Sequence, residues 1–134
     1  MDPIYLLDTN IASYAIKGNI PAVRRHLARV PLSQVALSSV TEAELRYGVA
    51  RLPDENRLRE IVHEFLIRLT ILPWDSRAAE SYAELRATLE HEGSPLGALD
   101  TMIASHALAE GLFLVTNDHA FRRVKNLKIE DWTK

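Results

Sequence analysis

Short apolar runs alternate with longer amphipathic stretches along this chain. Four runs, at residues 4–7, 35–37, 70–72 and 113–115, have the length and composition of buried strands, and a fifth strand is expected at residues 128–130. The clearest helical pattern follows the second run. There, Leu58, Ile61, Val62 and Phe65 recur at the three- and four-residue spacing of one helix face.

Further helices are expected at residues 10–17, 21–28, 40–49 and 76–92, with a last helix ending near Glu110, before Gly111. Ser94 and Pro95 predict the start of that last helix, as its N-cap and first residue. Strands that alternate with helices favour a mostly parallel sheet covered by helices on both faces. We therefore predict an α/β fold in a single domain, residues 1–134.

Two aspartates follow strand-like runs. Asp8 comes directly after the first run, and Asp118 follows the fourth run after Thr116 and Asn117. Ligands of parallel α/β sheets bind beyond the carboxyl ends of the strands, so both acids are expected at that edge. Each also has a structural interpretation. Asp8 is a good N-cap for the first helix unless Asn10 caps it instead, and Asp118 is a good N-cap for a short helix at 120–124.

Two further acids lie on helices. On a helical wheel, Asp100 falls within the apolar face formed by Leu99, Ile103 and Ala107. A buried carboxylate there costs several kcal/mol unless it binds a metal, is protonated or pairs with an arginine. Glu44 follows the second strand. Carboxylate oxygens without thiols or spaced histidines suit Mg²⁺ or Mn²⁺, so the four acids predict a divalent metal site.

The role of Glu44 depends on which residue caps its helix. Thr41 as N-cap would form a capping box with Glu44. Ser39 as N-cap would use Glu42 for the same purpose and leave Glu44 free. Glu42 and Glu44 cannot both face one cleft, because residues two apart on a helix point in different directions. We favour Ser39 as the N-cap and therefore Glu44 for the site.

Composition narrows the classes of protein. The formal net charge is −2, and no cysteine is present, which excludes disulfides, thiolate zinc sites and cysteine nucleophiles. Neither a signal peptide nor an apolar run of membrane-spanning length occurs, so a cytoplasmic protein is expected. Basic residues cluster around Arg24, Arg46 and Arg122, which suggests a basic rim around an acidic centre.

Four ordered segments, at residues 7–11, 39–48, 95–104 and 115–118, together resemble the PIN-domain ribonucleases, most closely the VapC toxins of VapBC type II toxin–antitoxin pairs. The resemblance extends from the first strand to the C-terminus. It implies an α/β/α sandwich and a Mg²⁺- or Mn²⁺-dependent endoribonuclease. Its acidic residues correspond to Asp8, Glu44, Asp100 and Asp118.

The resemblance also implies supporting roles and partners. Asn10 and Thr116 would support the metal ligands, and Arg46 and Arg122 would contact RNA phosphates. A homodimer, inhibition by a VapB-type antitoxin and contact with DNA only through that antitoxin are expected. The C-terminal Glu130, Asp131 and Trp132 resemble the subgroup that cuts initiator tRNA in the anticodon loop. The alternatives are a catalytically silent binding module of the same fold and a phosphoacceptor receiver-like domain.

Overall fold

The computed structural model describes residues 2–134 and contains one parallel sheet with strand order β3-β2-β1-β4-β5. The strands are β1 (Tyr5–Leu7), β2 (Val35–Ser38), β3 (Thr70–Leu72), β4 (Phe113–Val115) and β5 (Ile129–Glu130). All five predicted strands are confirmed to within one residue at each end. The order differs from the 2-1-3-4-5 order of receiver domains, so the receiver-like alternative is wrong.

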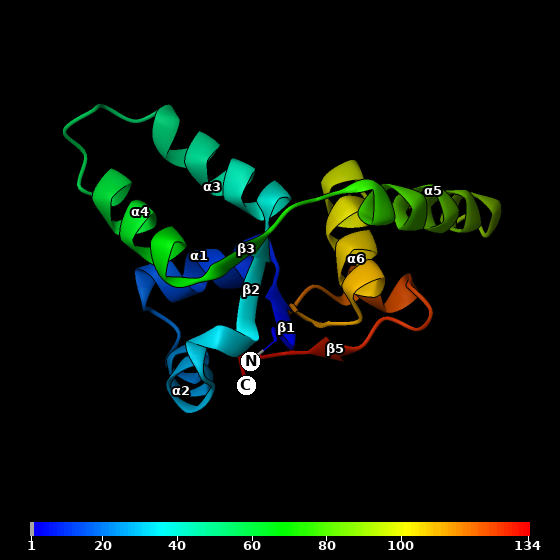
Figure 1. Cartoon of the computed structure of the whole chain (residues 1–134), viewed down its shortest axis with the longest axis horizontal. Helices are drawn as coiled ribbons and strands as arrows, with labels where there is room; N and C mark the ends of the chain where they lie inside the picture. Colours follow the sequence, from blue (N-terminus) through cyan, green and yellow to red (C-terminus); the bar gives the residue numbers. More distant parts are fainter. Residues whose placement is uncertain (1) are drawn as a thin grey trace.

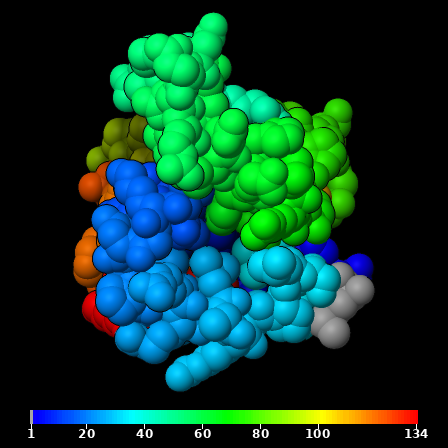
Figure 2. All heavy atoms as spheres, turned by 90° about the vertical axis from the view of Figure 1, so that its left-hand side faces the viewer, coloured from blue at the N-terminus to red at the C-terminus, as the bar shows by residue number. Residues whose placement is uncertain are grey.

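Helices cover both faces of the sheet (Figure 1). On one face lie α1 (Thr9–Lys17), α2 (Pro21–Arg29) and α4 (Leu58–Arg68), and on the other lie α5 (Ser76–His91) and α6 (Ala98–Glu110). Figure 2 shows the first of these faces, with α4 above α1 and α2. The α/β/α prediction is therefore confirmed. The remaining elements are α3 (Ser39–Ala50) and the 3₁₀ helices η1 (Leu32–Gln34) and η2 (His119–Arg123).

Alternating side chains of the short strands supply both layers of the core. In β1, Leu7 packs into the cluster under α1 and α4, whereas Leu6 packs into the cluster under α5 and α6. In β4, Val115 packs into the same cluster as Leu7, and Leu114 packs into the same cluster as Leu6. All four side chains are fully buried. The central strands are therefore apolar throughout and end abruptly in polar residues at one edge of the sheet.

The last helix starts later than predicted. Its first residue is Ala98, and Gly97 occupies the N-cap position without a side-chain hydrogen bond. Ser94 instead belongs to the C-terminal end of α5, where its amide donates a hydrogen bond to the Leu89 carbonyl at 2.9 Å. Gly93, just before it, has a φ of +71°, which is the left-handed conformation that commonly ends a helix. The Ser94–Pro95 start is thus wrong, since Ser94 is used to terminate the preceding helix.

The α-helices have lengths typical of a globular protein. Across residues 2–134, none is both long enough and apolar enough to span a lipid bilayer.

Candidate active site

Asp8 lies at the point where β1 ends and α1 begins. Its Oδ1 accepts a hydrogen bond from the Ile11 amide at 2.8 Å, so Asp8 is the N-cap of α1. Its Oδ2 accepts from the Thr116 hydroxyl at 2.5 Å. The possibility that Asn10 caps the helix is wrong, because Asn10 is already inside α1. Capping occupies one oxygen of Asp8 and leaves the other facing the end of β4.

The surroundings of Asp8 disfavour its charge. Only 4% of the residue is exposed, and this burial raises the pKa of Asp8 to about 6. The hydrogen bonds from Thr116 and Ile11 lower the pKa but do not outweigh the effect of burial. The charges of Asp100 and Asp118 raise the pKa further. Asp8, Asp100 and Asp118 therefore lie close enough to repel one another.

Glu44 is free of helix capping, although for a different reason from the one predicted. The N-cap of α3 is Ser38, whose hydroxyl accepts from the Val40 amide at 3.1 Å, so neither Ser39 nor Thr41 caps the helix. Glu42 closes no capping box and pairs with Arg46 at 2.9 Å. The side chain of Glu44 points instead toward α1.

Thr9 is the contact of Glu44 that sequence reasoning missed. The Thr9 hydroxyl donates to Glu44 Oε1 at 2.6 Å and lies 3.3 Å from the hydroxyl of buried Thr41. Thr9 is the first residue of α1, directly after Asp8. Its hydroxyl thus ties the helix carrying Glu44 to the strand end carrying Asp8. No local spacing signals a contact between residues 35 positions apart.

Asp100 occupies the first turn of α6 and is half-buried. The predicted apolar face is wrong at this end, because Leu99 is 47% exposed whereas Thr101 is buried. The first buried residue of α6 is Thr101, and burial is continuous from Ile103 to Ala107. Burial nevertheless raises the pKa of Asp100, and the charges of Asp118 and Glu44 add to the rise. No arginine or lysine within residues 2–134 forms an ion pair with Asp100, which removes the salt-bridge interpretation.

Asp118 has the predicted structural role. Its Oδ1 accepts from the Ala120 amide at 2.9 Å and caps η2. Its own amide donates to the Thr116 hydroxyl at 3.0 Å. Thr116 therefore bridges the ends of β1 and β4 through Asp8 and Asp118. The side chain of Asp118 is exposed and borders a small hollow that Arg122 also lines.

The remaining predicted residues lie farther from these contacts. Asn10 is exposed on α1, and its side chain forms no hydrogen bond within the described part of the chain. Arg46 is exposed and held by Glu42. Of the predicted supporting residues, only Thr116 contacts one of the four acids.

A buried pair joins the two helices that carry Glu44 and Asp100. Ser38 and His106 are both fully buried, and the Ser38 hydroxyl lies 2.8 Å from His106 Nδ1. Burial lowers the pKa of His106, which keeps the ring neutral near pH 7. No local spacing signals this contact between His106 and the N-cap of α3, which are 68 residues apart.

The donor chemistry fits a hard divalent cation. The acids offer carboxylate oxygens only, and no cation among residues 2–134 neutralises them. In the same residues, no three acidic or histidine side chains lie close enough together to hold a metal ion as they stand. A bound cation would remove the repulsion among Asp8, Asp100 and Asp118.

Comparisons with known proteins give one consistent result. Residues 5–127 match the model of the PIN domain family. Ribonuclease VapC2 of Rickettsia felis is 39% identical over 98% of this chain and 99% of its own length. The tRNA(fMet)-specific endonuclease VapC of Shigella flexneri is 38% identical over 96% of this chain and 98% of its own.

Solved structures agree with the sequence matches. The structure of VapBC2 from Rickettsia felis, bound to a promoter DNA fragment, superposes with a TM-score of 0.88 at 38% identity, covering 96% of this chain and 98% of that one. DNA-bound VapBC from Salmonella typhimurium gives a TM-score of 0.90 at 36% identity, covering 97% and 98%. This chain therefore belongs to the PIN-domain family and, within it, to the VapC ribonuclease toxins of VapBC toxin–antitoxin systems.

Proposed function

We propose that this chain cleaves RNA phosphodiester bonds with Mg²⁺ or Mn²⁺ held by Asp8, Glu44 and Asp100, with Asp118 at the periphery. The supporting observation is the group of acids at the carboxyl edge of the sheet, where Asp8 and Asp100 have raised pKa values and no paired cation. Helix capping uses one carboxylate oxygen of Asp8 and one of Asp118, which gives these two acids a structural role as well. Helix capping does not account for Asp100.

The ion, when bound, lowers the pKa of a water molecule and stabilises charge on the phosphate. The chain's own residues then position the reactants. Thr116 fixes the direction of Asp8 Oδ2, and Thr9 fixes Glu44. Arg122, on the rim, would hold an RNA phosphate by charge, as would Arg46 after release from Glu42. Asn10 would support Asp8 from the first turn of α1.

Replacing Asp100 with Asn tests the assignment. The Asp100→Asn variant should fold normally but lose Mg²⁺-dependent RNA cleavage and most Mn²⁺ binding in calorimetry. The control is Asp54→Asn, because the Asp54 side chain is 99% exposed and lies outside the site. Cleavage by Asp100→Asn at the rate of the control would overturn the proposal.

The proposed substrate is initiator tRNA, cut in the anticodon loop. Support comes from the relatives of Shigella flexneri and Salmonella typhimurium, which are both tRNA(fMet)-specific endonucleases at 38% identity. Purified initiator and elongator methionine tRNAs should be cleaved at very different rates, with the break mapped by primer extension. Equal cleavage of both tRNAs would remove the initiator preference.

We also propose a VapB-type antitoxin and a second copy of this chain as cytoplasmic partners, with DNA contacted only through the antitoxin. The side chain of Tyr47, on α3, is 68% exposed. It lines an apolar groove with Leu99 beside Glu44, and Ile61 and Ile67 are also exposed on α4. Such surfaces typically mark protein interfaces. Light scattering of the chain alone and after co-expression with the neighbouring reading frame tests both partners.

A further inference from the structure

We propose that a cavity between α5 and α6 binds a guanine base of the RNA, on a nucleotide flanking the cleaved bond. This inference rests on the proposed RNA cleavage and specifies one of its subsites. The cavity has a volume of about 250 Å³, and its walls include Tyr82, Arg86, Leu89, Glu90, Leu96 and Thr101. Within residues 2–134, none of these side chains forms a hydrogen bond or ion pair with the four acids described above.

The walls of the cavity, here called the slot, combine polar and aliphatic surface with one aromatic side. Leu89 and Leu96 contribute aliphatic surface, and the ring of Tyr82 is packed edge-on against Trp74 at 5.8 Å between centroids. The Thr101 hydroxyl donates to the Gly97 carbonyl at 2.8 Å, so it does not demand a polar ligand. A flat, aromatic ligand suits these walls, because bases of single-stranded RNA bind by stacking on such side chains.

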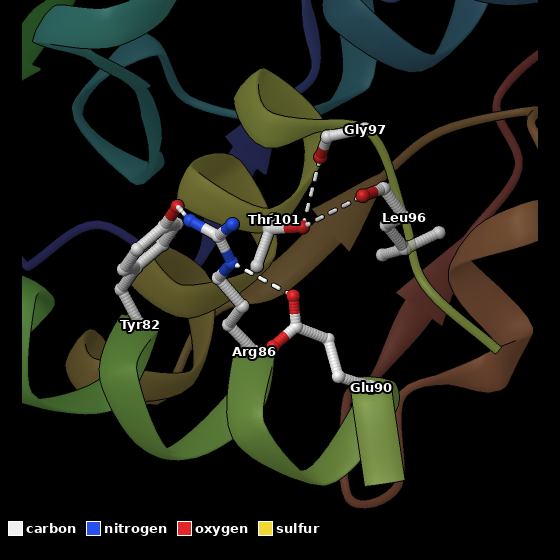
Figure 3. Close-up of polar contacts among 6 residues, drawn as sticks. All are labelled: Tyr82, Arg86, Glu90, Leu96, Gly97 and Thr101. Atoms are coloured by element: carbon white, nitrogen blue, oxygen red, sulfur yellow. Dashed lines mark hydrogen bonds and ion pairs between the residues drawn. The ribbon is translucent and has the colours of Figure 1, made fainter. Parts of the chain in front are cut away.

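Polar groups lie together at one side of the slot. Arg86 Nη1 donates to the Tyr82 hydroxyl at 3.0 Å, and Arg86 Nε donates to Glu90 Oε2 at 3.3 Å. Figure 3 shows the guanidinium held between these two partners and facing the N-terminal turn of α6. Arg86 Nη2 forms no hydrogen bond to any other residue of the 2–134 region. The slot therefore offers a ligand one hydrogen-bond donor, Arg86 Nη2, beside one acceptor, the carboxylate of Glu90.

The paired charges select among ligands. The carboxylate of Glu90 would repel a free phosphate, so the site does not suit a simple anion. Guanine presents acceptors at O6 and N7, which an arginine can bind, and donors at N1 and N2, which a carboxylate can accept. Adenine, cytosine and uracil each offer a carboxylate a single donor nitrogen beside an acceptor, whereas guanine offers two, N1 and N2, beside O6. The chemistry therefore points to guanine.

The slot and the four acids lie on different sides of the first turn of α6. Thr101 is adjacent to Asp100 on the first turn of α6, but its side chain points about 100° away around the helix. A helix with its side chains is about 10 Å across. RNA that passes over this turn would therefore place a neighbouring base in the slot while its backbone lies at the acids.

The slot is held open by contacts beyond its own residues. Arg123, on η2, donates through Nη1 to the Pro95 carbonyl at 2.9 Å and so fixes the loop before α6. Arg86 and Glu90 are each more than half exposed, so their replacement should leave the fold intact.

The test measures base preference in binding and in cleavage. Fluorescence anisotropy in EDTA, with an oligouridylate carrying one central guanosine or adenosine, should show about tenfold tighter binding of the guanosine form. Arg86→Ala and Glu90→Gln should each abolish this preference. The control is Arg77→Ala, since Arg77 is also an exposed, ion-paired arginine of α5. With Mg²⁺, Arg86→Ala should raise KM for guanosine-containing RNA more than it lowers kcat.

The outcomes separate the two proposals. A wild-type protein that cleaves no RNA with Mg²⁺ would overturn the proposed function. A wild-type protein that cleaves RNA without guanosine preference, or an Arg86→Ala variant that matches Arg77→Ala, would overturn the guanine site alone.

Discussion

Asp8 uses its two carboxylate oxygens for separate tasks. Oδ1 holds the first turn of α1, and Oδ2 receives the Thr116 hydroxyl at the end of β4. An N-cap and a metal ligand were treated as alternatives from the sequence, since a motif cannot show how the two oxygens are divided. The fold combines both roles, because it brings Thr116 across from a position 108 residues away.

The raised pKa of Asp8 predicts a specific pH dependence of stability without metal. A carboxyl group whose pKa is about 6 in the native state and near 3.8 when unfolded stabilises the protein at low pH. That contribution is lost as the pH rises through 6. We expect a loss of about 2 kcal/mol in unfolding free energy between pH 4 and pH 7, relative to Asp8→Asn. Urea unfolding in EDTA measures it, and parallel pH profiles of the two proteins would contradict it.

Thr9 predicts a positioning effect on Glu44. Thr9→Val keeps the shape of the side chain but removes the hydroxyl that donates to Glu44. RNA cleavage should fall roughly 10–100-fold, as is common when a residue that orients a ligand is lost. Thr9→Ser restores the hydroxyl and should recover most of the activity. Equal activity of the Val and Ser variants would show that the hydrogen bond is unimportant.

At the scale of elements, β2 runs directly into α3 without a loop. Ser38 is the last residue of the strand and also the N-cap of the helix, and its hydroxyl contacts His106 on α6. This contact connects the helix of Glu44 with the helix of Asp100. The relative position of these acids therefore depends on a buried hydrogen bond remote from both.

Removal of the Ser38 hydroxyl should destabilise this connection. Ser38→Ala loses the cap to Val40 and leaves His106 Nδ1 buried without its partner. We expect a loss of about 2 kcal/mol in the free energy of unfolding. Urea unfolding measures it, with Ser33→Ala on the exposed surface of η1 as the control. A loss no larger than that of the control would show that the Ser38 contacts contribute little.

Local sequence patterns predicted the elements far better than their ends. The apolar runs and the period of α4 depend only on neighbouring residues, and both agree with the structure. The N-cap of α3 and the start of α6 were wrong, because Ser38 also belongs to β2 and Ser94 belongs to the end of α5. The burial of α6 was misjudged for a related reason. Its first turn projects past the sheet, and no local pattern reveals where the neighbouring layer stops.

At the scale of the whole molecule, the four acids come from distant parts of the chain. Asp8 and Glu44 belong to the first third, whereas Asp100 and Asp118 belong to the last. Their types were recognisable from the sequence, but their contacts were not. Thr116 was expected as a supporting residue from the resemblance, but its hydrogen bond to Asp8 depends on the placement of β1 next to β4. Thr9 was missed, because its contact with Glu44 depends on the placement of α3 next to α1.

Metal binding should stabilise the assembled fold. A ligand that binds only the native state adds about 2.7 kcal/mol at a concentration 100 times its Kd. Mn²⁺ at pH 7.5 should therefore raise the Tm of the wild-type protein and of Asp54→Asn, but not that of Asp100→Asn. Thermal unfolding at increasing Mn²⁺ concentration measures this. A wild-type Tm that does not respond to Mn²⁺ would contradict metal binding by the four acids.

The central place of β1 also matters while the protein is being made. β1 leaves the ribosome before the other four strands, whereas its neighbour β4 and the acid that follows it are synthesised only after β2 and β3. Domains complete their folding only when such late segments are available. A nascent chain therefore lacks a complete set of acids until Asp118 has been synthesised. The order of the strands thus delays assembly of the proposed nuclease site until β4 and Asp118 have left the ribosome.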